Sequence, residues 1–237
     1  MHDQFAIISD WRPRNKVNDI SLEENSIFQV RLSHIEDPSI IYVQPLQLIG
    51  YENEILIDLQ NDINRFMSVE NLKFLRENVK PSYYKVGELY IYFVSGIPYR
   101  VVIEKLWTEA PKAQILSVDT GRRKVIDLSD RNLVPLPPNS ELTHSPFDTK
   151  FAVRISMGEI FPMESNGTWN PNCSKRIRKL YQNQVLIMYV TNPENGSAML
   201  FHYNEQTDRL SNIADDLVRR HLARRFDNIL GTQFFKK

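Results

Sequence analysis

The 237-residue chain contains little cysteine, little glycine and no excess charge of either sign. Its one cysteine, Cys173, excludes an internal disulfide and a cysteine-rich zinc site. Lys plus Arg and Asp plus Glu both number 29, so the formal net charge is zero. Because phosphate neutralisation supplies much of the affinity of duplex-binding proteins, this balance disfavours general nucleic-acid binding.

Long apolar runs are also absent from the sequence. The purest run, residues 185–190, is too short to cross a bilayer and is typical of a buried strand. Residues 1–25 mix charges with Trp11 and Pro13, so they do not resemble a signal peptide. Together with the single thiol, this composition favours a reducing compartment.

Sequence patterns of common catalytic sites are missing as well. The eight glycines form neither a phosphate-cradling loop nor a nucleophile elbow. The five histidines are scattered with no pair four residues apart, and the adjacent Asp215 and Asp216 point in different directions on a predicted helix. We therefore predict that the chain is not an enzyme, binds no cofactor and holds no metal.

The first half of the chain predicts a hairpin followed by a long helix. Strands at residues 27–31 and 40–44 flank a turn at residues 36–39. Apolar residues then recur every three or four positions, which predicts one amphipathic helix over residues 52–77 that ends before Pro81. These apolar residues are Ile55, Leu59, Ile63, Phe66, Val69 and Leu72.

Residues 86–138 predict a small barrel. Short strands are expected at residues 89–94, 99–106, 115–119 and 124–128, with tight turns between them. A stiff linker with prolines at 135, 137 and 138 follows.

The remainder of the chain predicts an α+β unit. Strands are expected at residues 150–155, 184–190 and 198–203, with helices at 175–181 and 213–222. An isolated hairpin is only marginally stable, so we expect the first hairpin to join this unit with the barrel inserted between them.

Four segments together resemble a known family. They are residues 86–89 (VGEL), 98–102 (PYRVV), 118–121 (VDTG) and 213–223 (IADDLVRRHLA). Their order and spacing are similar to those of extended Tudor domains. The resemblance implies a mostly β fold with helices, in which a five-stranded Tudor barrel is inserted into a discontinuous nuclease-like OB-fold domain. The implied limits are residues 25–50 and 139–230 for the OB-fold domain, 51–80 for a linking helix and 81–138 for the Tudor core.

The resemblance also implies a function. Extended Tudor domains are adaptors that bind arginine-glycine peptides, often symmetrically dimethylated, from the N-terminal tails of PIWI-type Argonautes. A methylated guanidinium is a flat, weakly hydrated cation that gains energy between aromatic faces. The implied location is the cytoplasmic, perinuclear germ granule (nuage) of the piRNA pathway.

The family's aromatic cage transfers to this chain only in part. Its first and second aromatic residues correspond to Phe93 and Tyr99, but its third and fourth correspond to Ser117 and Thr120. The polar residue after the turn glycine corresponds to Arg122, a like charge for an incoming arginine. Each lost aromatic forfeits roughly 0.5–2 kcal/mol, so two losses weaken binding by roughly ten- to a thousand-fold.

We therefore expect a peptide-binding site that does not require methylation. An unmodified arginine peptide, or a peptide lying mainly along a groove between the two lobes, fits these cage residues better than a dimethylated arginine does. Moving the alignment by one residue places Leu116 at the third wall, which is still not aromatic. Taking Tyr92 instead of Phe93 as the first aromatic changes the set of cage residues. Asp119 is a candidate partner for the peptide arginine, although such aspartates often bond their own turn.

Two other functions stay open. One is RNA binding through basic clusters late in the chain, and the other is self-association within a larger scaffold. The clustered cations are Lys175, Arg176, Arg178, Lys179, Arg219, Arg220, Arg224 and Arg225. Aromatic residues suited to base stacking are sparse around them. Phe93 and Tyr99 also have a purely structural alternative as core aromatics of the barrel.

Overall fold

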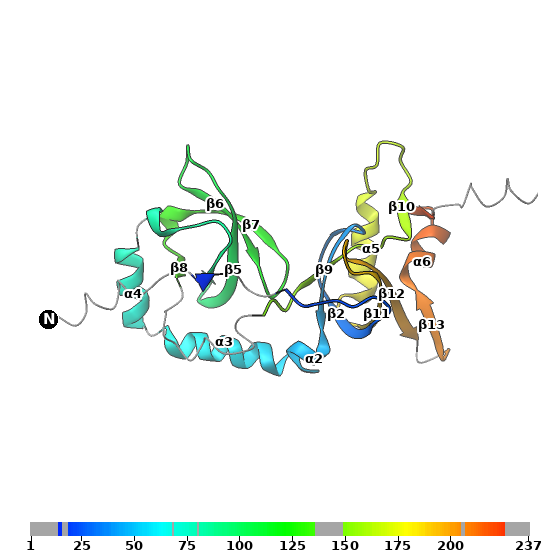
Figure 1. Ribbon diagram of the computed structural model, residues 1–237, viewed down its shortest axis with the longest axis horizontal. Helices are drawn as coiled ribbons and strands as arrows, with labels where there is room; N and C mark the ends of the chain where they lie inside the picture. The colour runs from blue at the N-terminus through cyan, green and yellow to red at the C-terminus, as the bar shows by residue number, and fades with distance from the viewer. Residues whose placement is uncertain are drawn as a thin grey trace, which may run out of the picture. The chain divides into compact units, whose positions relative to one another are not determined.

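The computed structural model describes residues 14–15, 19–67, 69–79, 81–135, 149–204 and 207–225 (Figure 1). The chain divides into two compact units. The barrel unit comprises residues 1–20 and 47–152, and the second unit comprises residues 21–46 and 153–237. Each unit is described separately below.

The barrel unit is a meander of antiparallel strands. In chain order the strands are β1 (Arg14–Asn15), β4 (Glu88–Val94), β5 (Ile97–Leu106), β6 (Lys112–Ser117), β7 (Arg123–Asp127) and β8 (Leu133–Pro135). The hydrogen-bonded order is β1-β4-β5-β6-β7, and β8 also pairs with β4. The sequence predicted the four central strands, but β6 ends at Ser117, so Asp119 lies in a turn rather than in a strand.

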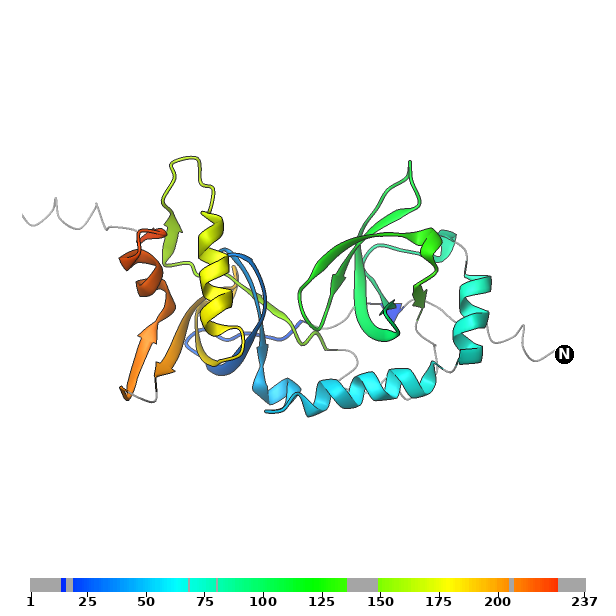
Figure 2. The ribbon, with the colours of Figure 1, turned by 180° about the vertical axis from the view of Figure 1, so that it is seen from behind.

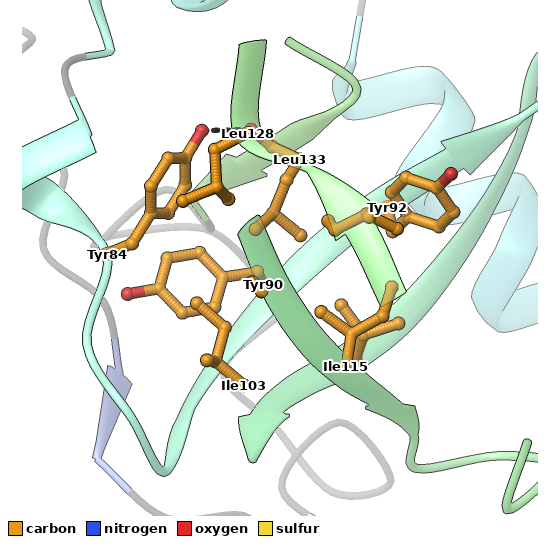
Figure 3. Close-up of a cluster of buried hydrophobic side chains, with 10 residues drawn as sticks. Tyr84, Tyr90, Tyr92, Ile103, Ile115, Leu128 and Leu133 are labelled. Atoms are coloured by element: carbon orange, nitrogen blue, oxygen red, sulfur yellow. Dashed lines mark hydrogen bonds between the residues drawn. The ribbon is translucent and has the colours of Figure 1, made fainter. Parts of the chain in front are cut away.

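Aromatic and branched side chains fill the barrel. Tyr90 is fully buried, and its ring meets the Tyr84 ring edge-on at 5.5 Å between centroids (Figure 3). The Tyr84 hydroxyl donates to the Leu133 carbonyl at 2.8 Å. Burial raises the pKa of Tyr84 to about 12, so this donor stays protonated across the physiological range. The interior of the barrel is therefore a packed core.

The predicted single helix over residues 52–77 is wrong, because the structure has two. Helix α3 (Glu54–Phe66) ends where Met67 leaves the helical conformation with φ −86° and ψ 60°. Helix α4 (Val69–Asn78) follows, and the short elements α2 (Leu46–Ile49) and η1 (Pro81–Tyr83) flank the pair. Helix α3 contacts β5 and helix α4 contacts β8, so the two halves of the predicted helix pack on different strands.

The second unit is built on one six-stranded sheet in the order β13-β12-β11-β2-β3-β9. These strands are β2 (Ile27–Asp37), β3 (Ile40–Pro45), β9 (Val153–Ile155), β11 (Val185–Asn192), β12 (Ser197–Asn204) and β13 (Arg209–Asn212). A parallel bridge between Ser156 and Ser197 connects the β9 end of the sheet to β12 and closes it. The expectation that the first hairpin joins the C-terminal portion is confirmed, because β2 pairs with β11.

Two helices complete this unit (Figure 2). Helix α5 (Pro171–Tyr181) contacts β2 and buries Cys173 and Ile177. Helix α6 (Ile213–Arg219) contacts β12, and its cap residue Asn212 accepts a hydrogen bond from the Ala214 amide at 2.8 Å. The small pair β10 (Ile160–Pro162) and β14 (Ala223–Arg225) was not predicted. Among the described residues no helix is both long and apolar enough to cross a membrane.

Candidate functional site at the barrel opening

Two turns lie at the same end of the barrel, because β4 and β6 run in the same direction. One joins β4 to β5 through Ser95 and Gly96, and the other joins β6 to β7 over residues 118–122. We call this end the barrel opening. All six predicted site residues lie in these turns or close to them along the chain.

The β4–β5 turn sets which aromatic residues share the barrel face. Ser95 and Gly96 both have positive φ (50° and 83°), as a two-residue hairpin turn requires. The resulting register pairs Tyr92 with Tyr99. Directly paired residues point to the same face, so Tyr92 and Tyr99 lie together, and both pack with the barrel core. Tyr92 is at the far side of that core from Tyr84 (Figure 3).

Phe93 faces the other way. It pairs with Pro98 and follows Tyr92 in the strand, so its side chain points away from the Tyr92–Tyr99 face. It is only 5% exposed, and the guanidinium carbon of Arg76 lies 5.9 Å from its ring centroid. The structure thus places the two predicted cage aromatics on opposite faces of the hairpin.

Ser117 and Thr120 use their hydroxyl groups within their own turn. The Ser117 Oγ accepts from the Thr120 amide at 3.2 Å, and the Thr120 Oγ1 accepts from the Arg122 amide at 3.4 Å. Gly121 is buried with φ 73° and donates its amide to the Ser117 carbonyl at 2.8 Å. The opening therefore has small polar groups where an aromatic wall would need bulk, while the Arg122 side chain is exposed.

Asp119 is already bound by an arginine of its own chain. Arg100 is fully buried, and its Nε and Nη2 both donate to the Asp119 carboxylate, the former at 3.1 Å. Because this two-point pair uses both carboxylate oxygens, Asp119 is held by Arg100 and fixes the turn in place. Arg100 was not among the predicted site residues. Its position in the sequence was a usable signal. Arg100 lies between Tyr99 and Val101, which face the barrel core, so its charged side chain must point to the opposite face of the strand.

Arg100 also fixes the chain that returns to the barrel. Its Nη2 donates to the Thr149 carbonyl at 2.9 Å, and its guanidinium carbon lies 4.8 Å from the Phe151 ring centroid. The Ala152 amide donates to the Val118 carbonyl at 3.0 Å. Residues 149–152 are therefore held against the turn that carries Asp119.

A lysine stands at the hydroxyl end of Tyr92. The Lys124 Nζ donates to the Tyr92 Oη at 3.0 Å and lies 5.1 Å from the ring centroid. These two distances place the ammonium beyond the ring edge, so it leaves the aromatic face uncovered. Lys124 pairs with Ile115 across the strands, which turns its side chain toward the barrel face. The opening thus contains a cation of its own.

A small barrel inserted between the first hairpin and the remaining strands of an OB-like sheet is the extended Tudor fold. Within the described part of the chain, no group of three or more acidic, histidine or cysteine side chains is arranged to hold a metal ion.

Solved structures share this architecture across nearly the whole chain. The extended Tudor domain of human TDRD1, bound to a symmetrically dimethylated peptide, is 20% identical, with a TM-score of 0.67 over 92% of this chain and 97% of that one. A second extended Tudor domain, TD3 of mouse TDRD1, bound to a MILI peptide containing dimethylarginine, is 17% identical, with a TM-score of 0.68 over 90% and 100%.

A third structure, from Drosophila melanogaster, holds a different form of peptide. It is a variant Papi extended Tudor domain in complex with an unmethylated Piwi N-terminal peptide, 17% identical, with a TM-score of 0.64 over 85% of this chain and 100% of that one. No family model and no curated protein matches the sequence. The predicted fold class is confirmed.

Proposed function

We propose that this chain is a non-catalytic adaptor that binds an arginine-containing N-terminal tail of a PIWI-clade Argonaute, in perinuclear germ granules of the cytoplasm, without requiring arginine methylation. The extended Tudor fold supports the general role, because structures of this fold hold arginine peptides in methylated and unmethylated forms. The finer proposal is supported by the barrel opening, where Ser117 and Thr120, which the family resemblance aligns with two aromatic walls, are small polar residues bonded within their own turn.

The chemistry of the opening favours an unmodified guanidinium. A free arginine carries five N–H donors and requires acceptors, whereas methylation removes donors and rewards aromatic contact. Here the Tyr99 ring supplies one aromatic surface beside Tyr92, and the neighbouring turn supplies hydroxyl and carbonyl oxygens. The Asp119 carboxylate is bound to Arg100, so these turn oxygens rather than Asp119 would accept from the peptide.

Exposed apolar groups next to Tyr99 extend the proposed site. Val94 and Ile97, which flank the hairpin turn, are 39% and 48% exposed. Small or apolar residues beside the peptide arginine would pack on them, so we propose Tyr99, Thr120 and Arg122 as contact residues. In the same proposal, Ser117 shares the barrel face with Tyr99 because it pairs with Val101, whereas Phe93 and Asp119 support the turns from the other side.

Calorimetric titration of one arginine-glycine peptide, unmodified and symmetrically dimethylated, tests this function. The proposal predicts binding of the unmodified form at least as tight as that of the dimethylated form. Tyr99→Ala should weaken binding about fivefold to thirtyfold, as expected for one desolvated cation–π contact. Tyr83→Ala is the matched control, because Tyr83 is 44% exposed and lies near the start of β4, away from the opening.

Phe93→Ala tests whether the peptide arginine binds on the Tyr99 face or on the Phe93 face of the hairpin. If Phe93 only supports the hairpin from its far face, this variant lowers stability and changes the Kd less than Tyr99→Ala does. A larger loss at Phe93 would place the arginine on the opposite face. Strict dependence on dimethylation would contradict the proposal.

RNA binding is a second candidate, favoured by one feature of the second unit. A recess of about 450 Å³ at the end of α5 is lined by Lys175, Arg178 and Lys179, with Gln182 and Gln184 beside them. The other predicted cluster is less suitable, since Arg219 and Arg220 both bind the Asp216 carboxylate, at 3.0 and 3.1 Å.

Filter binding to single-stranded RNA at two salt concentrations tests this alternative. If RNA phosphates contact these cations, the affinity falls steeply with increasing salt and is lower in Lys175→Glu/Lys179→Glu than in the natural chain. The control is Arg219→Glu/Arg220→Glu, which alters charges already paired with Asp216. Binding that is absent, or independent of salt in all proteins, would remove RNA from consideration.

A further inference from the structure

The outer face of the sheet in the second unit is unusually apolar. Side chains on a strand alternate between faces, and those of β11 and β12 that point into the unit are buried. The opposite set is half-buried or exposed although it is mostly apolar. It comprises Ile27 on β2, Val185, Ile187 and Tyr189 on β11, Met199, Phe201 and Tyr203 on β12, and Leu210 on β13. We call this surface the outer sheet face.

Strand register makes these residues one continuous patch. Tyr189 lies between Ile27 and Met199, and Ile187 pairs with Phe201. Tyr203 pairs with Leu210 at the β13 edge. The strands β2, β11, β12 and β13 are hydrogen-bonded in this order, so the eight side chains form adjacent rows rather than scattered points.

The size of the patch decides what kind of partner fits it. Ile27, Leu210, Tyr203 and Val185 are 68%, 51%, 45% and 38% exposed. Since large side chains present on the order of 150–200 Å² each, the four expose roughly 350 Å², and the four half-buried residues raise this to roughly 500 Å². A standard interface covers about 800 Å² per partner and is about 57% apolar, which is about 450 Å² of apolar surface. The outer sheet face meets that requirement.

The described residues at the two ends of the patch differ in net charge, with three acidic residues at one end and two basic and one acidic at the other. At the Ile27 end, the turns at residues 23–26 and 193–196 bring the exposed Glu23, Glu24 and Glu194 to the edge. At the opposite end, Arg31 pairs with Val185 across the strands and Arg209 stands at the β12–β13 turn. Asp208 at this end accepts a hydrogen bond from the Tyr203 hydroxyl.

We propose that the outer sheet face binds a second copy of this chain, in a two-fold arrangement that stacks the two sheets. Rotation about a two-fold axis that lies between the sheets, perpendicular to the strands, places the acidic end of one copy on the opposite end of the other, twice per dimer. Stacked sheets pack about 10 Å apart through interdigitated side chains, which suits rows of large apolar residues. This site is separate from the barrel opening and does not depend on the arginine-peptide proposal.

Sedimentation equilibrium of the whole chain, over protein concentrations from about 10 µM to about 500 µM, measures the association. The proposal predicts a monomer–dimer equilibrium in this range. Ile27→Asp/Leu210→Asp should weaken it about tenfold or more, because two exposed apolar anchors per copy become charged. Ile57→Asp is the control, since Ile57 is 48% exposed on α3 of the other unit and should leave the dimer unchanged.

A charge swap identifies the two-fold arrangement itself. Glu23→Lys/Glu24→Lys and Arg31→Glu/Arg209→Glu should each associate several-fold more weakly than the natural chain, and an equimolar mixture of the two should recover the association. Arg209→Glu is measured alone as well, so that a folding defect at the half-buried Arg31 does not decide the outcome.

Three results would overturn the proposal. They are a monomer at every concentration, a dimer insensitive to Ile27→Asp/Leu210→Asp, and failure of the mixed charge variants to recover association. Titration of the arginine-glycine peptide against the same variants is the separate readout. Peptide binding should be unaffected in all of them, so loss of dimerisation and loss of peptide binding are distinguishable.

Discussion

The two units of this chain stabilise their arginines in opposite ways. In the barrel unit one fully buried arginine, Arg100, binds one carboxylate, Asp119, and lies against the Phe151 ring. In the second unit one carboxylate, Asp216, binds three arginines, of which Arg219 and Arg220 are largely exposed. The first arrangement is a single buried pair, whereas in the second two of the three arginines are open to solvent.

This difference bears on where a peptide arginine can bind. Because Asp119 is bound by Arg100, the proposed site offers an arginine peptide the turn hydroxyls and the Tyr99 ring instead of that carboxylate. The arginine-rich cluster of the second unit is likewise neutralised in part, which lowers its attraction for phosphate.

The largest expected effect is at the buried pair. Asp119→Ala should lower the free energy of unfolding by about 3–5 kcal/mol, because it leaves the Arg100 charge buried without its carboxylate. Urea unfolding measures this loss. Replacing both partners, Arg100→Met/Asp119→Leu, should recover part of it, since no charge is then buried. A loss below about 1 kcal/mol in the single variant would contradict the assigned role of the pair.

A smaller loss is expected when the other carboxylate is removed. Asp216→Ala should lower the free energy of unfolding by about 1–3 kcal/mol, because Arg176 loses its partner while the exposed Arg219 and Arg220 turn to solvent. The same urea experiment compares the two units directly. Equal losses of unfolding free energy at Asp119 and Asp216 would show that burial of the arginine does not determine the size of the loss.

The Asp216 cluster also predicts a pH dependence. Burial opposes ionisation of Asp216, but hydrogen bonds from Arg176, Arg219 and Arg220 outweigh it and lower the pKa to about 2 from the usual 3.8. A depressed folded-state pKa adds stability above pH 3.8 that is lost as the pH falls toward 2. After discounting for solvent around the exposed arginines, this amounts to about 1 kcal/mol. The stability gap between the natural chain and Asp216→Asn should close over this window, and a constant gap would refute the assignment.

The smallest effect concerns the cation at the barrel opening. Lys124→Met should change the free energy of unfolding by less than about 1 kcal/mol, since the Lys124 side chain is exposed. It should tighten binding of an arginine peptide about twofold to fivefold by removing a like charge. Arg123→Met is the control, because Arg123 is paired with Glu104 at 2.8 Å. Unchanged or weaker binding in Lys124→Met would mean that the peptide arginine lies elsewhere.

Local patterns predicted most of the strands because turn chemistry and alternation are local signals. The hairpin before residue 46 and the strands around the Ser95–Gly96 turn follow from such signals. The break between α3 and α4 could not be predicted, since apolar periodicity continues from Ile63 through Leu72 across the point where α3 ends.

The sequence could place the candidate site along the chain but could not predict the contacts around it. The family pattern identifies Tyr99, Ser117 and Thr120, and the structure places all three beside the opening. The family pattern cannot reveal that Arg100 binds Asp119 or that Arg76 lies against the Phe93 ring. These partners are 19 and 17 residues apart in the sequence, and the contacts depend on the face of the strand to which each side chain points.

Placing tyrosine at the two positions that the family resemblance aligns with aromatic walls tests the proposed function most directly. The ratio of Kd values for dimethylated and unmodified forms of one arginine-glycine peptide is measured calorimetrically for the natural chain, Thr120→Tyr and Ser117→Tyr/Thr120→Tyr. We predict a ratio near or above one for the natural chain, falling about tenfold or more in the double variant as aromatic faces are added. A natural chain that already strongly prefers the dimethylated peptide, with no change in the double variant, would contradict the account.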